Sequence, residues 1–344
     1  MDWRQLATSS SGKAIRDERF TLVPAFRLAQ LDGAVFHLAI APRIAGEIRS
    51  FRPDVIIVQG ASDTALALVA RRLARRRVPV VFDVQGDWRH DSRVYGAGAR
   101  RLLIPLTDSL ARVAVRHADG VRTISGFTTQ LVREQGVEPT ATFPTYMDLA
   151  PFLNTPPAPL PSPPRALFVG VLERYKAVDV LAEAWKLVAG RLPEAELHIV
   201  GNGRLETTIT DLVADPGLRV RWTPRLETPE VSRALDEATL LVLPSRREGM
   251  GRVIIEAFCR GRAVVGTSSG GILDLVDDGV SGLLVPVDDA AALAHALAKV
   301  LDDSELARTL GDGARAASGR WSATPDEFAA RVRELVDLVL AARS

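Results

Sequence analysis

The chain has 344 residues and a mass of 37.2 kDa, which exceeds what one hydrophobic core usually supports, so two domains are expected. A content of 47% hydrophobic and 25% charged residues is that of an ordinary globular protein and excludes a disordered or fibrous chain. No apolar run approaches the roughly 20 residues that span a bilayer, and the opening residues lack the order of a signal peptide. A cytosolic location is therefore expected.

The net charge of +1 is unevenly distributed along the chain. Residues 1–150 contain 21 Lys and Arg against 15 Asp and Glu, whereas residues 151–344 contain 22 against 27. The basic first half suggests an anionic partner or surface, although arginines scattered over solvated helices explain it equally well.

Short apolar strands alternate with helical patterns in the first half of the chain. Strands are predicted at 54–58, 78–82 and 120–124, and helices at 62–76 and 100–117. Strands that are apolar throughout and separated by helices indicate a parallel sheet covered on both faces.

A proline-rich stretch at residues 154–164 interrupts this alternation. It cannot sustain a helix and lacks the N–H donors of a central strand, so we interpret it as a semi-rigid linker between two lobes. The predicted lobes are an N-terminal domain at 1–155 and a C-terminal domain at 165–320. Residues 321–344 are predicted to form a helix that packs back on the N-terminal domain.

The same alternation recurs after the proline-rich stretch. It predicts a helix at 178–188 and strands at 165–170, 196–200, 240–243 and 263–266. Two doubly wound α/β domains that face a cleft are therefore expected, and such sheets bind their ligands at the carboxyl ends of the strands.

The loop after the strand at 240–243 contains the residues best suited to hold a ligand. Glycines at 249 and 251 let the backbone approach closely, and the helix that begins near Gly251 offers its N–H groups to a phosphate. Glu248 in the loop and Glu256 about a turn and a half into the helix can accept hydrogen bonds from different hydroxyls of one extended ligand. The alternative is that Glu248 caps the helix and Glu256 is a solvated helix residue.

Most of residues 165–300 resemble the retaining glycosyltransferases of family 4, which have the GT-B fold of two Rossmann-like domains. The resemblance rests on two glutamates with seven residues between them after a Pro-Ser turn, followed by a glycine-rich strand and loop. These features correspond to Glu248, Glu256, Pro244-Ser245, and the segments 199–203, 264–271, 278–286 and 288–293.

The resemblance implies a role for each matching residue of this loop and helix. Glu248 would sit beside the transferred sugar and hold its hydroxyls, and Glu256 would hold the nucleotide ribose. The backbone at Met250, Gly251 and Arg252 would meet the diphosphate. Donor binding is thus expected in the second lobe.

A second donor-binding segment begins at Gly170. Within it, Lys176 matches the lysine with which the family neutralises the departing diphosphate, and a fixed cation there stabilises charge that grows as the glycosidic bond breaks. The family usually has an arginine directly after the glycine, where this chain has Val171. Arg174 is the candidate to replace it, with a solvated arginine as the alternative.

The resemblance also implies the reaction. The family retains anomeric configuration, which favours front-face substitution, with the leaving oxygen helping to deprotonate the acceptor hydroxyl. No cofactor and no metal are expected, because Lys176 and a helix start handle the phosphate charge and the sequence has no cluster with metal-ligand spacing. The expected partners are a nucleotide-sugar donor and a glycan or lipid-linked acceptor of cell-envelope biosynthesis. Binding of nucleic acid is not expected.

Gln85 and Asp87 follow a strand of the first lobe and are candidates for the acceptor side. Relatives often have a histidine near Gln85, and an amide in its place still forms hydrogen bonds but does not titrate. His90 is close enough in sequence to be considered. A turn or a helix cap is the alternative role for Asp87.

The opening of the chain departs from the family pattern. Family members usually begin with a central strand, a glycine-rich turn and a helix, whereas residues 1–12 have no such strand. The N-terminal domain is therefore expected to lack its first strand. Our hypothesis is that the recorded sequence lacks its true start.

Basic residues of the first lobe suggest a peripheral contact with an anionic membrane. They lie at 71–77 and on an amphipathic helix that contains Arg100, Arg101, Arg112 and Arg116. The alternative is an ordinary surface helix with its apolar face in the core.

Two other functions remain open from the sequence. A sugar-nucleotide epimerase or hydrolase of the same fold would bind the donor without an acceptor. A catalytically silent nucleotide-sugar-binding scaffold would explain the missing first strand together with Val171 and Gln85.

Overall fold

The computed structural model describes residues 4–9, 15–16, 20–24, 32–88 and 104–343. The chain divides into two compact units. Unit 1 consists of residues 1–123, 129–142 and 331–344, and unit 2 of residues 124–128 and 143–330. None of the helices within the described ranges is long and apolar enough to cross a membrane.

The proline-rich stretch belongs to unit 2, so the boundary between the units lies at residue 142 and not at 155 as expected. Two buried arginines of unit 2 bind the carbonyl oxygens of this stretch. Arg260 donates to those of Thr155 at 2.7 Å and Pro156 at 2.9 Å. Arg262 donates to that of Ala158 at 2.6 Å. Because these carbonyls are fixed to unit 2, the stretch is part of that unit's surface and not a free spacer.

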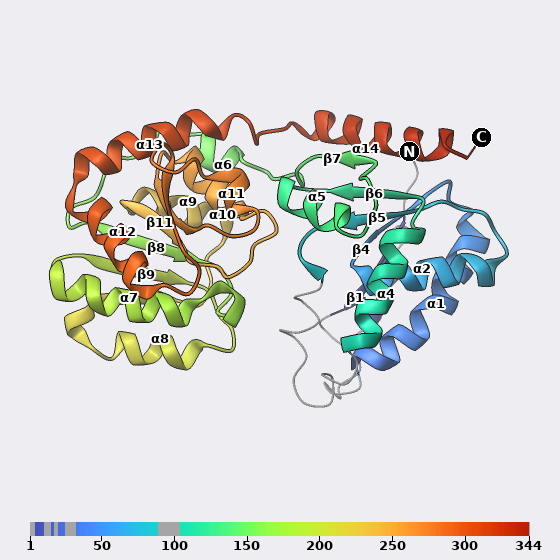
Figure 1. Cartoon of the computed structure of the whole chain (residues 1–344), viewed down its shortest axis with the longest axis horizontal. Helices are drawn as coiled ribbons and strands as arrows, with labels where there is room; N and C mark the ends of the chain where they lie inside the picture. The colour runs from blue at the N-terminus through green and yellow to red at the C-terminus, as the bar shows by residue number, and fades with distance from the viewer. Residues whose placement is uncertain (1–3, 10–14, 17–19, 25–31, 89–103, 344) are drawn as a thin grey trace. The chain divides into compact units, whose positions relative to one another are not determined.

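Unit 1 contains a parallel sheet in the order β4-β5-β6-β7, which Figure 1 shows with helices packed against it. All residues of β5 and β6 are buried, as expected for a sheet covered on both faces. Its strands are β4 (Ile56–Gln59), β5 (Val80–Val84), β6 (Gly120–Thr123) and β7 (Ala141–Thr142), and its helices include α1 (Asp32–Phe51), α2 (Ala61–Ala74), α4 (Ile104–His117) and most of α5 (Gly126–Arg133).

The last helix, α14 (Pro325–Ala341), begins in unit 2 and ends in unit 1. Its Val339 is buried directly against Gly120 at the start of β6, where a Cβ atom would lie 2.5 Å from the Val339 side chain. Arg343 then forms an ion pair with Asp119. The end of the chain is therefore part of the core and surface of unit 1.

The opening of the chain forms a strand, but within the described residues this strand does not join the β4–β7 sheet, in agreement with the expectation that this sheet lacks its first strand. β1 (Gln5–Ser9) pairs in parallel with β3 (Phe20–Pro24), and β2 (Ile15–Arg16) completes a separate three-stranded sheet. Among the strands that the structure describes, none from before β4 pairs with the β4–β7 sheet. β1 was missed because its sequence mixes polar and apolar residues and so lacks the continuous apolar run of a buried strand.

Unit 2 contains a six-stranded parallel sheet in the order β10-β9-β8-β11-β12-β13. The chain moves outward from β8 in one direction and then resumes at β11 on the other side, which creates a topological switch point between these two strands. The strands are β8 (Arg165–Val169), β9 (Glu196–Val200), β10 (Val220–Thr223), β11 (Leu240–Leu243), β12 (Ala263–Thr267) and β13 (Gly282–Val285).

Helices lie on both sides of this sheet (Figure 1). α7 packs against α12, and α10 packs against α13. The fully buried side chains of Phe168, Trp185 and Phe258 are in the core between these helices and the sheet. The helices of unit 2 are α6 (Ala150–Leu153), α7 (Val178–Arg191), α8 (Glu206–Val213), α9 (Thr228–Asp236), α10 (Arg252–Cys259), α11 (Ile272–Leu275), α12 (Ala290–Asp302) and α13 (Ser304–Ser318), with short 3-10 turns η2 (Arg174–Lys176) and η3 (Pro216–Leu218).

His198 on β9 is a buried histidine whose protonation opposes folding. Arg221 donates to its Nδ1 at 2.9 Å, so Nε2 carries the proton and donates to Thr223 Oγ1 at 2.9 Å. Burial, together with the charges of Arg221 and Arg165, lowers the pKa of His198 from 6.5 to about 4. The folded protein therefore keeps this imidazole neutral in mildly acidic solution.

We predict that His198→Gln reduces the acid sensitivity of the fold. Between pH 6.5 and about 4 the unfolded chain binds a proton at His198 that the folded chain does not bind. The free energy of unfolding consequently falls as pH decreases through this window. The free energy of unfolding is measured with urea at neutral pH and at about pH 4.5. Between these two pH values it should fall by about 2 to 3 kcal/mol less in the variant than in the wild type. The exposed His295→Gln is the control, and an equal loss in both variants would contradict the prediction.

Candidate functional site

The candidate site of unit 2 lies at the carboxyl edge of its sheet. β8 leads directly into Gly170 and the turn η2, and β11 leads into the loop at residues 244–251. β8 and β11 are parallel neighbours, so both loops emerge at the same edge, at the switch point where doubly wound sheets bind ligands.

Lys176 and Glu248, predicted to act on the same donor, are in direct contact. The Lys176 Nζ atom donates a hydrogen bond to Glu248 Oε2, and the two side chains are only 12% and 15% exposed. Ser245 Oγ lies 3.4 Å from the same carboxylate oxygen. The structure thus brings together two residues that are 72 positions apart in the sequence. The pair places a cation and a carboxylate beside each other at the end of β8 and β11.

The glycine-rich segment after β12 holds the backbone around Glu248. Ser269 Oγ donates to the Arg246 carbonyl at 2.7 Å, and the Gly271 N–H donates to the Glu248 carbonyl at 2.8 Å. A Cβ atom at Gly270 would lie 2.4 Å from the Glu248 carbonyl oxygen, so only glycine permits this approach. The glycines of this segment therefore position Glu248.

Arg246 joins the two loops of the site and was missed from the sequence. Its guanidinium donates to both carboxylate oxygens of Asp179, at 3.0 and 2.8 Å, and to Asp288 at 2.6 Å. It also donates to the Arg174 carbonyl, and its own N–H donates to the Tyr175 carbonyl at 2.8 Å. Arg246 therefore fixes the turn that contains Lys176 against the loop that contains Glu248. The only signal for it in the sequence was its place two residues before Glu248.

The charges around Arg246 stabilise one another. The hydrogen bond with Asp179 raises the pKa of Arg246, against the opposing effect of burial, and Asp288 adds to this. Burial by itself would raise the pKa of Asp179, but its hydrogen bonds and charge interaction with Arg246 outweigh that effect and lower it. Arg246 and Asp179 are thus both ionised at neutral pH.

The 199–203 segment supports Gly170 from the neighbouring strand β9. Gly170 N–H donates to the Val200 carbonyl at 2.9 Å. Gly201 adopts a φ of +142°, and a Cβ atom there would lie 1.8 Å from the Gly170 carbonyl oxygen. The role of this segment, which resembles the family pattern, is therefore to pack closely against the backbone of Gly170.

The predicted diphosphate contacts lie at the start of α10. Gly251 precedes this helix in the left-handed conformation, with a φ of +73°. The Met250 side chain is buried in the core, so only its backbone is available to a ligand. Arg252 is exposed, and so is Arg174, which has no carboxylate partner in the part of the chain that the structure describes.

Glu256 lies in the second turn of α10 and is partly buried. Burial raises the pKa of its carboxyl group, while the positive charge of Arg252 acts in the opposite direction. Within the described residues the Glu256 side chain forms no hydrogen bond or ion pair with Lys176 or Glu248. The structure thus brings Lys176 and Glu248 together but leaves Glu256 separate from that pair.

In unit 1, one of the two acceptor-side candidates, Gln85, is attached to a buried ion pair. Arg122 on β6 donates to Asp83 on β5 at 2.7 Å, and both side chains are 5% exposed. Gln85 Nε2 donates to the same carboxylate at 2.6 Å, and Asp87 is buried. Burial lowers the pKa of Arg122, against the opposing influence of Asp83. The sequence did not indicate this pair. His90 lies outside the described residues.

No group of three or more His, Cys, Asp and Glu side chains placed to hold a metal ion occurs in the described ranges. Positively polarised groups near the switch point include Lys176, the start of α10 and the exposed Arg174 and Arg252. Chemically, this arrangement suits an anionic ligand that also presents hydroxyl groups to a carboxylate.

Two family patterns match the chain. The pattern described as "Glycosyl transferases group 1" matches residues 163–303, and the pattern described as "Glycosyl transferase 4-like domain" matches residues 6–145. Together they account for most of both units. The second match begins within β1, in the segment that seemed atypical from the sequence.

Among known relatives, D-inositol 3-phosphate glycosyltransferase of Thermobispora bispora is 35% identical over 194 residues. The match covers 52% of this chain and 45% of the relative, so it spans about half the length of each protein.

Among solved structures, sucrose-phosphate synthase from Thermosynechococcus elongatus has a TM-score of 0.79 at 20% identity, and the match covers 97% of this chain and 87% of that one. Anabaena HepE in complex with UDP has a TM-score of 0.69 at 18% identity, with coverage of 94% and 86%. At these identities the likeness concerns the fold alone.

We predict that Arg246→Lys weakens unit 2, because a lysine cannot reproduce the two-pronged bond to Asp179. The expected loss of about 1 kcal/mol lowers the melting temperature by about 2 to 4 °C. The control is Arg225→Lys, which alters an exposed ion pair with Glu227 whose side chains are 77% and 68% exposed. Differential scanning calorimetry that gave the same melting temperature for both variants would contradict the prediction.

Proposed function

The chain belongs to the family 4 glycosyltransferases of the GT-B fold, and on that premise we propose that it moves a sugar from a nucleotide-diphosphate donor to an acceptor hydroxyl with retention of anomeric configuration. The observation that carries the proposal is the contact between Lys176 and Glu248 at the switch point. In such a donor the phosphate and the sugar hydroxyls are close together. The site offers Lys176 as a cation for the phosphate and Glu248 beside it as a carboxylate for the hydroxyls.

In this proposal the donor replaces the contact between the two side chains. The diphosphate takes Lys176 as its counter-ion, and the freed Glu248 carboxylate accepts hydrogen bonds from the sugar. The start of α10 at Gly251 presents backbone N–H groups to the phosphates, and Gly170 lets the loop after β8 approach them closely. Exposed Arg174 and Arg252 add positive charge, and Glu256 holds the ribose. Arg246 is a positioning residue, since it fixes both loops without facing the donor.

Transfer proceeds by front-face substitution. The bond between the anomeric carbon and the diphosphate oxygen breaks as the acceptor oxygen forms its bond on the same face of the sugar. The acceptor proton passes to the leaving diphosphate oxygen. Lys176 stabilises the negative charge that develops on that oxygen, which is where fixed electrostatic stabilisation has its largest effect.

The acceptor and the location follow from the same premise. Gln85 and Asp87, which follow β5, are proposed to face the acceptor side, with the Asp83–Arg122 pair as the support of Gln85. We propose a glycan or lipid-linked acceptor of the cell envelope and a cytosolic location. The names of the relatives support inositol phosphate as a test acceptor and UDP-sugars as first test donors.

Lys176→Ala and Glu248→Gln are expected to lower donor turnover about a hundredfold to a thousandfold, as does removal of one preorganised electrostatic group in other enzymes. Turnover is measured with the donor that most raises the melting temperature in a screen of common sugar nucleotides. Lys186→Ala and Glu183→Gln, exposed residues of α7, serve as controls with the same changes of charge.

Two results would replace this proposal. Rapid turnover of the donor without any acceptor would favour an epimerase or hydrolase. Wild type, Lys176→Ala and Glu248→Gln that were all inactive while still binding nucleotide would favour a silent scaffold.

We further predict that removal of divalent metal by EDTA leaves donor turnover unchanged. Lys176 and the start of α10 supply the positive charge that a metal would otherwise provide. Turnover is compared before and after dialysis against EDTA, and after Mg²⁺ is returned. A loss that Mg²⁺ restores would show that the diphosphate needs a metal in this protein.

A further inference from the structure

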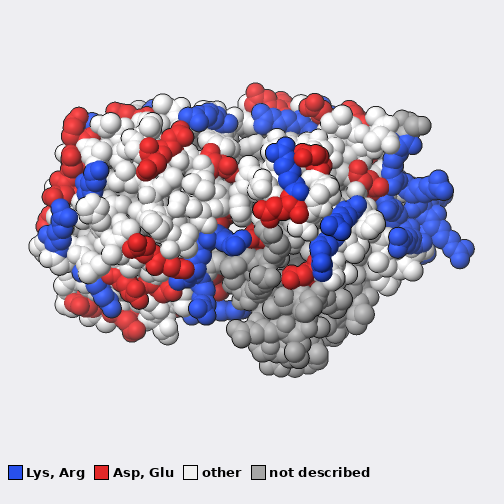
Figure 2. Space-filling view, viewed as in Figure 1, with Lys and Arg blue, Asp and Glu red and all other residues white. Residues whose placement is uncertain are grey.

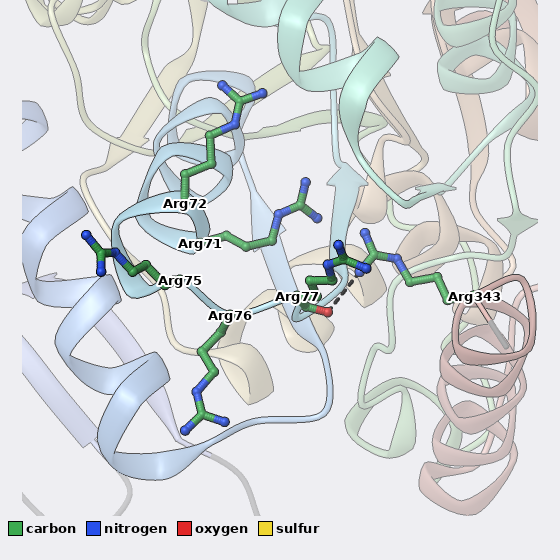
Figure 3. A pocket seen from close by; sticks show the side chains of 6 residues that line it. All are labelled: Arg71, Arg72, Arg75, Arg76, Arg77 and Arg343. Carbon is green, nitrogen blue, oxygen red and sulfur yellow. Dashed lines mark hydrogen bonds between the residues drawn. The ribbon is translucent and has the colours of Figure 1, made fainter.

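Six arginines gather at one end of unit 1. They line a hollow of about 730 Å³ at the carboxyl-terminal end of α2, and they are Arg71, Arg72, Arg75, Arg76, Arg77 and Arg343. Figure 3 shows that five come from the end of α2 and the turn that follows it, and the sixth from the end of the chain. Figure 2 shows Lys and Arg side chains forming a continuous area over this part of unit 1.

Two of the six arginines are fixed by ion pairs within unit 1. Arg71 and Arg343 both form ion pairs with Asp119, whose carboxylate also accepts from the Val80 N–H at 2.8 Å. Arg343 additionally donates to the Arg77 carbonyl at 2.8 Å. The end of the chain is thus tied to the turn between α2 and β5.

The other four arginines, Arg72, Arg75, Arg76 and Arg77, are called here the basic end of α2. None of them has a carboxylate partner among the residues that the structure describes. Figure 3 shows the side chains of Arg72, Arg75 and Arg76 pointing apart and outward. Four like charges within six residues repel one another, and the negative end of the helix dipole offsets only part of this repulsion. Binding to an anionic surface would therefore relieve the repulsion among the four arginines of the basic end of α2.

Exposed apolar side chains accompany these charges. Val69 and Leu73 are 46% and 48% exposed. With Arg72 they have the spacing i, i+3 and i+4, which forms one stripe along the last turns of α2, and Arg76 follows just beyond the end of this helix. A soluble oligoanion would use the arginines alone. A bilayer interface accepts both groups, because the arginines meet lipid phosphates while the apolar side chains enter the headgroup region.

The basic end of α2 and the candidate acceptor side lie at opposite edges of the β4–β7 sheet, so a surface bound at the basic end does not cover the acceptor side. α2 ends and β5 begins at the amino edge of the β4–β7 sheet, whereas Asp83 and Gln85 lie at the carboxyl end of β5. α4 packs against α2 and also ends at the amino edge, where its Arg112 and Arg116 are exposed. Arg100 and Arg101, expected to share in such a surface, lie outside the described residues.

We propose that the basic end of α2, with Val69 and Leu73, docks unit 1 on an anionic lipid bilayer. The partner is the lipid surface itself, recognised through its phosphate groups. This binding needs neither donor nor acceptor, so it can be tested independently of the transfer reaction.

The experiment is flotation of the full-length protein with vesicles of phosphatidylcholine alone or with added phosphatidylglycerol, without substrates. Each arginine near an anionic surface strengthens binding about fivefold. The variant in which Arg72, Arg75, Arg76 and Arg77 are all changed to Gln should therefore bind the anionic vesicles at least about a hundredfold more weakly. The control removes the same charge from unit 2 by changing the exposed Arg191, Arg204, Arg225 and Arg308 to Gln.

A second variant, Val69→Ser with Leu73→Ser, keeps every charge and should still weaken binding to the anionic vesicles. All the altered side chains are exposed, and unchanged melting temperatures confirm that the variants fold. Equal binding to both kinds of vesicle, or equal losses in the arginine variant and its control, would overturn the proposal. So would a wild type that gains melting temperature from tripolyphosphate but does not float with anionic vesicles, since that result identifies a site for soluble anions.

Discussion

The pairing of β8 with β11 is the constraint on which the candidate site depends. These strands are separated by 70 residues of chain that form β9, β10 and their helices, yet they are hydrogen-bonded neighbours in the middle of a parallel sheet. Their loops consequently emerge side by side, and Lys176 meets Glu248. Arg246 converts this proximity into a fixed geometry, because it binds Asp179 and Asp288 while its own loop supplies Glu248.

The contact between Lys176 and Glu248 also explains how two mostly buried charges are tolerated without a ligand. An isolated charge in this position would lose much of its hydration, whereas a paired charge recovers part of that loss. In the proposed reaction the donor offers both side chains a replacement partner at once. The site is thus preorganised for a ligand that carries phosphate and hydroxyl groups a short distance apart.

The elements that the sequence predicted best are those with continuous apolar runs. β9 and β11 have the expected bounds, and β8 and β12 differ by one residue. β10 and β13 were not predicted, because each is only four residues long and includes polar or half-exposed positions. The proline-rich stretch was predicted to be a spacer since its composition excludes regular structure. Its attachment to unit 2 depends on Arg260, whose partners in the stretch, Thr155 and Pro156, are more than 100 residues away.

The sequence by itself determined the α/β class, the family, and the identity of the segments around Glu248 and Lys176. These are properties of short stretches, in which residue type and spacing suffice. Only the tertiary structure decided that Lys176 pairs with Glu248, that Arg246 clamps their loops, and that Gln85 is attached to the buried Asp83–Arg122 pair. It also decided that Arg343 joins Arg71 at Asp119. Apart from the bond between Gln85 and Asp83, these contacts join residues far apart in the chain. The distance between such residues is set by strand order and helix packing, which no local pattern specifies.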